Sequence, residues 1–133
     1  MERKILFKAK RLDNGEWEEG SLLLSERGKV CIGTMLDSNE ENGTPVCFKC
    51  REVDPATVCQ FTGLKDKEGM DIFEGDLLYD EDSGIVSAIK WKRNICGYVY
   101  EKAGAFATMR VFSNHTCFLK VIGNKFDRKE GEK

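Results

Sequence analysis

Apolar and polar residues alternate along the first third of the chain in a pattern that predicts antiparallel strands. Residues 4–12 alternate with a period of two, which is typical of a half-buried strand. Asn14-Gly15 follows and predicts a hairpin turn, because both residue types tolerate positive φ. Residues 17–24 and 29–33 then predict the second and third strands. This part of the chain is therefore expected to form an antiparallel meander.

The second strand of this meander is expected to carry much of its core. Trp17 directly follows the turn and is expected to anchor the core there, while residues 22–24 are expected to be the buried end of the strand. Residues 36–44 are polar, rich in Asn and contain a Gly near their end, so they predict a mobile loop, after which residues 45–53 resume the apolar alternation. Further on, Asp54 is expected to cap a single helical turn that begins at Pro55.

The second half of the chain consists of short runs that are rich in β-branched and aromatic residues. The runs are separated by Gly or Asn and comprise residues 85–91, 96–100, 107–112 and 117–122. This spacing is typical of a small barrel or sandwich. A period of 3.6 residues is only weakly present, over residues 100–110. We therefore predict an all-β, mostly antiparallel fold.

Two turn signals in the centre of the chain set this layout. Gly63 and Gly69 bracket a polar stretch that contains Asp66, and Gly75-Asp76 follows one strand length later. A glycine adopts positive φ at no steric cost, and an aspartate beside it can accept a hydrogen bond from the backbone two residues on. We expect these five residues to have a structural role, as turns between strands.

Several of these segments together resemble the YopX family, small proteins of phages and bacterial prophages. The similar segments are FKAKRLDNGEW at 7–17, TVCQFTGLKDKEG at 57–69, IFEGDL at 72–77 and VIGN at 121–124. A long stretch with fixed Gly and Asp spacing is a fairly specific signature. The chain departs from the family pattern in the cysteine-bearing segment 46–59 and at residues 125–127, which affects local details only.

The resemblance implies a division of the chain and a biological setting. It implies an SH3-like barrel in the second half, so we predict a meander lobe at 1–56, a barrel lobe at 57–126 and a solvated tail at 127–133. It also implies a protein encoded by a phage or prophage. The family has no established catalytic activity, so the resemblance supplies a setting and no mechanism.

Composition is that of an ordinary folded protein. The 133 residues are 41% hydrophobic and 33% charged, which suits one domain or two small lobes. The first residues lack a signal-peptide core, and no apolar run is long enough to cross a membrane. We therefore expect a cytoplasmic protein with no membrane contact. Its six cysteines are then expected to be reduced thiols.

Charge is close to balanced overall but alternates in sign along the chain. Residues 1–11 and 85–110 are mainly basic, whereas 12–45 and 65–82 are mainly acidic. Neighbouring strands of opposite sign can pair, which is the structural explanation and the one we favour. The functional explanation is that faces of opposite sign drive self-association or bind a charged partner.

The cysteines raise the question of a metal site. Cys47 and Cys50 form a C-x-x-C pair, and Cys31 and Cys59 would complete four thiolate ligands for zinc. In an extended strand, however, residues three apart point to opposite faces and lie about 10 Å apart, too far for ligands that converge on one ion. We interpret these residues as small core or surface thiols and predict no metal and no cofactor.

Other candidate chemistries have weaker support. Asp80-x-Asp82 resembles the start of a calcium loop, but the sharp-turn Gly and the bidentate Glu of such a loop are absent. His115 is the only histidine and has no visible partner for catalysis. Paired acids such as Glu74 and Asp76 could do acid/base work, but in turns such residues are usually caps. We predict no catalytic residues.

Lys90-Trp91-Lys92-Arg93 is the best candidate for a binding site. A cluster of cations around an aromatic ring can hold phosphates and stack a base. Strand alternation, however, is expected to send Trp91 inward with Ile89, which leaves the lysines on the solvent face. The chain is also slightly acidic, where proteins that bind nucleic acid are usually basic.

The function that these residues favour is binding and not catalysis. We predict a protein-binding or self-assembling module that contacts a protein partner or further copies of itself. The first alternative is a small β-barrel that binds nucleic acid through residues 90–93, and the second is an uncharacterised enzyme. No small-molecule ligand is predicted.

Overall fold

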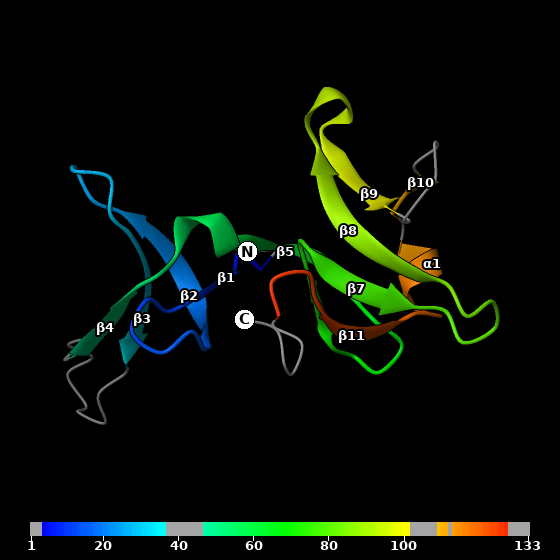
Figure 1. Cartoon of the computed structure of the whole chain (residues 1–133), viewed down its shortest axis with the longest axis horizontal. Coiled ribbons are helices and arrows are strands. Elements are labelled where there is room, and N and C mark those ends of the chain that lie inside the picture. Colours follow the sequence, from blue (N-terminus) through cyan, green and yellow to red (C-terminus); the bar gives the residue numbers. More distant parts are fainter. Residues whose placement is uncertain (1–3, 37–46, 102–108, 112, 128–133) are drawn as a thin grey trace. The chain divides into compact units, whose positions relative to one another are not determined.

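A computed structural model describes residues 4–36, 47–101, 109–111 and 113–127 (Figure 1). The chain divides into two compact units, residues 1–60 and 61–133. The boundary predicted from the sequence, after residue 56, falls slightly earlier. Most of the predicted loop at 36–44 and of the predicted tail at 127–133 lies outside the described residues.

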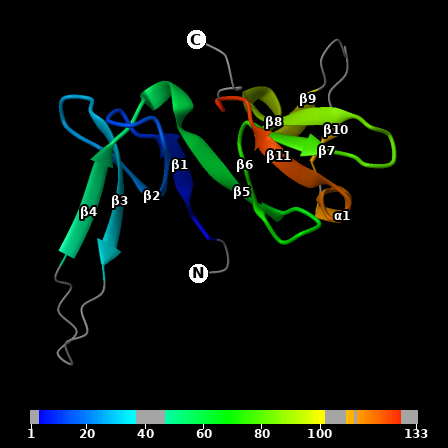
Figure 2. The same cartoon turned by 60° about the horizontal axis from the view of Figure 1, so that its bottom comes forward.

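Unit 1 is an antiparallel sheet. Its strands are β1 (Phe7–Lys10), β2 (Trp17–Leu24), β3 (Val30–Leu36) and β4 (Cys47–Glu52). They are hydrogen-bonded in the order β4-β3-β2-β1 (Figure 2). The other edge of β1 pairs with the first two residues of β5 (Cys59–Lys65), a strand that continues into unit 2. The meander predicted for this part of the chain is confirmed.

The core of unit 1 lies on one face of this sheet. Ala9, Ile32 and Val53 are buried there, with Leu22 among the partly buried residues packed against them. The expectation that residues 22–24 are all buried is wrong. Successive residues of a strand point to opposite faces, so Leu23 leaves the core face, and Leu24 returns to it only beyond the core, where 70% of it is exposed.

Trp17 also differs from the expectation of a core anchor. Its ring is only half-buried, and the ammonium groups of Lys8 and Lys10 lie 4.7 and 5.6 Å from the ring centroid. The cross-strand register explains this, because Trp17 faces Lys10 on β1 and Lys8 lies two residues along. Trp17 is thus a surface residue covered by lysine side chains.

The described part of unit 2 contains the continuation of β5 and six further strands. They are β6 (Asp71–Phe73), β7 (Asp76–Tyr79), β8 (Val86–Lys92), β9 (Gly97–Glu101), β10 (Met109–Arg110) and β11 (Lys120–Asn124). β5 pairs with β6, and the remaining strands pair antiparallel in the order β10-β9-β8-β7-β11. The all-β, antiparallel prediction is confirmed, and the SH3-like barrel stays a prediction.

Among the described residues, helical structure is limited to single turns. These are η1 (Pro55–Thr57), η2 (Arg93–Ile95) and α1 (Ser113–Thr116). The cap predicted for η1 is confirmed, because the Asp54 side chain accepts a hydrogen bond from the Ala56 N–H at 3.0 Å. Among the described residues, none of the helices has the length and apolar character that crossing a membrane requires.

The core of unit 2 links the β5–β6 hairpin to the larger sheet. Ile72 of β6 packs with Leu78, Ile89 and Tyr100 from β7, β8 and β9. Leu119 and Val121, near the end of the chain, pack against the same cluster. The central motif and the last strand therefore belong to one folding unit.

Candidate functional site

The motif aspartate Asp66 lies at the junction between the turn that follows β5 and the distant strand β11. Its carboxylate accepts hydrogen bonds from the backbone N–H groups of Glu68, Met70 and Val121, at 2.8, 2.9 and 2.9 Å. Burial by itself raises the pKa of Asp66, but the three donors outweigh it and the pKa lies below its ordinary value. Asp66 is therefore an ionised structural acceptor.

The second motif aspartate, Asp76, is completely buried. One carboxylate oxygen accepts from the Phe73 N–H at 2.7 Å, and the other accepts from the side-chain amide of Asn124 at 2.9 Å. The same amide also donates to the Glu74 carbonyl at 3.2 Å. Glu74 and Asp76 are thus parts of a closed turn, and their arrangement does not form an open acid/base pair.

The motif glycines occupy backbone conformations that other residues adopt only with strain. Gly63, Gly69 and Gly75 have φ of +90°, +81° and +83°. Gly75 is also confined, because a Cβ there would lie 3.3 Å from the Asn124 side chain, whereas Gly69 faces open space. Asp66, Gly69 and Gly75 lie in the two connections that follow β5 and β6. The turn expected at Gly63 is not found, because Gly63 lies within β5, where the pairing with β6 shifts register, and Asp76 is the first residue of β7.

The basic candidate at residues 90–93 lies at the β8–β9 hairpin, and one prediction for it is wrong. Ile89 is buried, but 43% of Trp91 is exposed. Trp91 lies opposite Tyr98 near the end of the hairpin, beyond the core, and packs edge-on against that ring with centroids 5.1 Å apart. The core ends before this residue, so alternation alone did not bury it.

The charges of this candidate are not gathered on one surface. Lys90 and Lys92 alternate with Trp91 along β8, so they point away from the face that the indole occupies. Lys90 also forms an exposed ion pair with Glu101 at 3.2 Å. Arg93 begins the helical turn η2 and is exposed. These residues are thus close in sequence, but in the structure they lie on two faces of the hairpin.

The cysteines do not converge on one point in the described residues. Cys31 and Cys50 are neighbours, and both burial and a hydrogen bond with Cys50 raise the pKa of the Cys31 thiol. Cys59 is buried elsewhere, with its thiol donating to the Thr57 carbonyl at 3.3 Å. The side chain of Cys47 lies outside the part of the chain that the structure describes. Within the described part of the chain, no group of three or more metal-ligating side chains is present.

Sequence reasoning missed an apolar surface on the face of the unit 1 sheet opposite its core, which we call the Leu23 face. It comprises Leu23, Met35, Phe48 and Cys50, from β2, β3 and β4. The exposed fractions of Leu23, Met35 and Phe48 are 36, 62 and 57%. The side chains share one face because Met35 pairs with Phe48, while Cys50 pairs with Gly33, two residues from Met35.

Gly33 lets two apolar side chains approach each other at the centre of the Leu23 face. A Cβ at Gly33 would lie 2.7 Å from Leu23 Cδ1 and 2.9 Å from Phe48 Cζ, so these two side chains lean across the glycine. One sequence signal could have revealed this face. The doublets Leu23-Leu24 and Met35-Leu36 interrupt the alternation and put apolar groups on both sides of the sheet.

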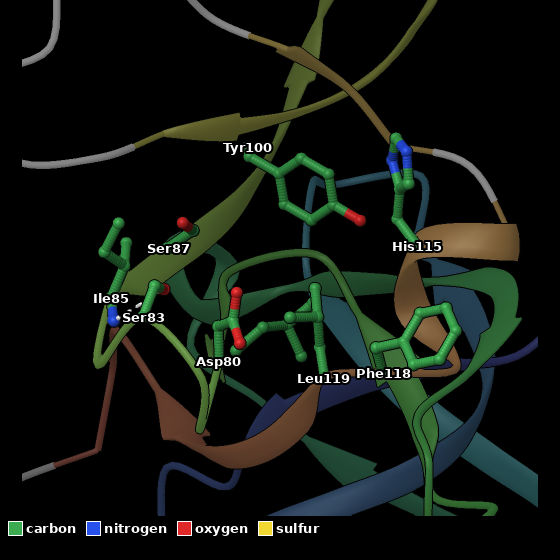
Figure 3. Close-up of a pocket in the computed structure, with 9 residues that line it drawn as sticks. Asp80, Ser83, Ile85, Ser87, Tyr100, His115, Phe118 and Leu119 are labelled. Atoms are coloured by element: carbon green, nitrogen blue, oxygen red, sulfur yellow. Dashed lines mark hydrogen bonds between the residues drawn. The ribbon is translucent and has the colours of Figure 1, made fainter.

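A pocket of about 260 Å³ lies within unit 2 (Figure 3). Its apolar lining includes Leu78 and Phe118, and its polar lining includes Asp80 and Tyr100. His115, the only histidine, also lines it from α1, with its ring 6.4 Å from that of Tyr100. The structure thus brings His115 and Asp80, which the sequence analysis weighed separately, to one cavity.

These features define a class of small antiparallel β protein, with a turn motif that is structural and an exposed apolar sheet face. A sequence model described as YopX protein matches residues 6–130, nearly the whole chain. The chain therefore belongs to the YopX family. No curated protein matches it.

Proposed function

We propose that this YopX family protein is a non-catalytic protein-binding module that self-assembles through the Leu23 face. The observation that carries the proposal is the exposure of Leu23, Met35 and Phe48 side by side on one sheet face. Exposed large apolar groups normally lie singly on a protein surface, whereas a contiguous group is typical of an interaction site.

A second copy is the partner that fits this face best. The surface is apolar at its centre, where the side chains of Leu23 and Phe48 lean across Gly33. Two flat sheet faces can stack about 10 Å apart and interdigitate their side chains, as in a β-sandwich. A two-fold axis through the face would bring Phe48 of each copy onto the same patch of the other, and such isologous contacts are the commonest in homo-oligomers.

The chemistry of the motif supports a role without catalysis. Asp66 and Asp76 direct their carboxylate oxygens at backbone and amide donors within the fold. A general acid or base must instead reach a substrate. A cytoplasmic location in a bacterium, and an origin in a phage or prophage, belong to the same proposal; phage genes on both sides of the coding sequence would support that origin.

Sedimentation velocity across a concentration series tests the self-assembly. The wild type is expected to shift from monomer to dimer as concentration rises, and Met35→Lys is expected to remain monomeric. Met70→Lys is the matched control, because Met70 is similarly exposed, at 56%, but lies beside β6 in unit 2. A wild type that stays monomeric throughout, or equal loss of dimer in both variants, would contradict the proposal.

Nucleic-acid binding at the β8–β9 hairpin is a second candidate. The observation that favours it is the exposed Trp91 ring, which can stack a base while Lys92 and Arg93 lie nearby along the chain. The contribution of the lysine and arginine charges to the affinity is expected to fall as the salt concentration rises.

A gel shift with single-stranded oligonucleotides tests this candidate. Lys90→Glu and Lys92→Glu should each abolish a salt-sensitive shift. Lys65→Glu is a matched control, since Lys65 and Lys90 have similar side-chain exposure, 62 and 60%, and each forms an exposed ion pair. Equal retention of the shift in all three variants, or no shift by the wild type, rejects binding at this hairpin.

A further inference from the structure

The pocket in unit 2 has the build of a ligand site. Strands β7, β8 and β9 form its walls together with the turn after β7 and the segment that follows α1 (Figure 3). Leu78, Ile85, Phe118 and Leu119 supply an apolar lining. A mostly apolar cavity with a few convergent polar groups is the usual form of a small-molecule site.

Tyr100 contributes a polar group that the fold itself does not satisfy. The residue is only 5% exposed, and its hydroxyl has no hydrogen-bond partner among the described residues. Figure 3 shows that hydroxyl directed into the space beside His115. Leaving a buried hydroxyl unpaired is costly, so a ligand that pairs with it gains that free energy. Burial raises the pKa of Tyr100 to about 12, so the hydroxyl remains a donor at neutral pH.

Asp80 brings a carboxyl group to the pocket from the turn that follows β7. Its Oδ1 accepts from the Asp82 N–H at 3.0 Å, which holds the side chain in place. No hydrogen bond among the described residues uses Oδ2. The described residues that line the pocket include no lysine or arginine, and the nearby Glu81 is paired with Lys67 outside it.

We propose that this pocket binds a small organic amine with an apolar or aromatic body. The ammonium group would donate to the Asp80 carboxylate, the body would lie against Leu78 and Leu119, and a polar substituent at the far end would pair with the Tyr100 hydroxyl. The sequence alone predicted no small-molecule ligand, because the pocket is assembled from separate strands. This site lies within unit 2 and stands independently of the Leu23 face.

Tyramine is a suitable probe because it carries an amine, a ring and a hydroxyl. Binding would be measured from changes in ¹H–¹⁵N spectra of the whole protein during titration. Changes are expected at the backbone amides of Ser83, Ser87 and Leu119, with saturation. The neutral analogue 4-ethylphenol should bind about tenfold more weakly, and 4-hydroxyphenylacetate, which carries the opposite charge, should not bind.

Two pairs of variants locate the interactions. Asp80→Asn should weaken the binding of tyramine about tenfold, while Asp82→Asn in the same turn should leave the affinity unchanged. Tyr100→Phe keeps the ring and should weaken the binding of tyramine about fivefold. Tyr79 lies on the same sheet but does not line the pocket, so Tyr79→Phe should leave the affinity unchanged. The ¹⁵N spectrum of each variant without ligand reports whether it is folded.

Three outcomes would overturn the proposal. A wild-type spectrum unchanged by all three probes would mean that the cavity holds only water. Equal binding of tyramine and 4-hydroxyphenylacetate would reject the role of Asp80 and the amine class. Changes outside the pocket, unaffected by Asp80→Asn in a folded variant, would place tyramine elsewhere.

Discussion

The carboxylate of Asp66 accepts a hydrogen bond from the backbone N–H of Val121, 55 residues further along the chain, at 2.9 Å. This contact joins the turn between β5 and β6 to the last strand, β11. The Lys67 N–H strengthens the same junction by donating to the Leu119 carbonyl at 3.0 Å. The motif in the centre of the chain therefore holds the C-terminal strand in place.

Replacing Asp66 should destabilise unit 2. Asp66→Asn puts an NH₂ group against backbone donors and removes a charge-assisted acceptor, so we expect a loss of about 2 to 3 kcal/mol in the free energy of unfolding. Urea denaturation followed by circular dichroism measures it. Asp82→Asn, on an exposed turn, is the control and should change stability little. A loss of similar size in both variants would refute the role of Asp66.

The lowered pKa of Asp66 predicts a specific dependence of stability on pH. Because the pKa is lower in the folded than in the unfolded state, the stabilisation is complete above the unfolded value of about 3.9 and is lost as pH falls through the folded value. The stability difference between wild type and Asp66→Asn should therefore be constant near neutral pH and shrink below about pH 4. A difference that grows in acid would contradict this assignment.

The motif glycines should differ in their tolerance of a side chain. Gly69→Ala should cost about 1 kcal/mol, because only the strain of a positive φ is added. Gly75→Ala should cost about 2 kcal/mol, because its Cβ would also press on Asn124 and Lys125. Thermal unfolding of the two variants gives the comparison. Equal losses of stability in the two variants would contradict the added cost that we assign to the contacts around Gly75.

Tyr100 should affect stability in alkaline solution. Burial raises its pKa to about 12 in the folded state, above the ordinary value of about 10. The folded state therefore disfavours ionisation, and stability should fall as pH rises from about 10 towards 12. Tyr100→Phe should lessen this fall. Absorbance titration should show one tyrosine of the native protein that ionises at higher pH than the others. Loss of that step in Tyr100→Phe would identify Tyr100 as this tyrosine.

Local features of the fold could be predicted from the sequence, because neighbouring residues determine them. The bounds of β2 at 17–24 and the Asp54 cap before Pro55 follow from turn and cap chemistry within a few residues. The depth of burial could not be predicted this way. Leu24 and Trp91 are exposed because each lies beyond the core that its strand crosses, and only the assembled sheet sets that limit.

The candidate sites depend even more on tertiary structure. Met35 and Phe48 are brought together by the register of β3 with β4, which no local pattern specifies. Asp80, Tyr100 and His115 come from three separate elements, so their shared pocket could not be seen in the sequence. The short helix α1 was missed because its four residues are too few for a helical period.

The most direct test of self-assembly is an isotope-filtered nuclear Overhauser experiment on a mixture of labelled and unlabelled chains. Only contacts between two copies give signals in it. The account predicts signals between the Phe48 ring of one copy and the methyl groups of Leu23 and Met35 of the other. Intermolecular signals confined to other surfaces, or none at concentrations where sedimentation shows a dimer, would contradict assembly through the Leu23 face.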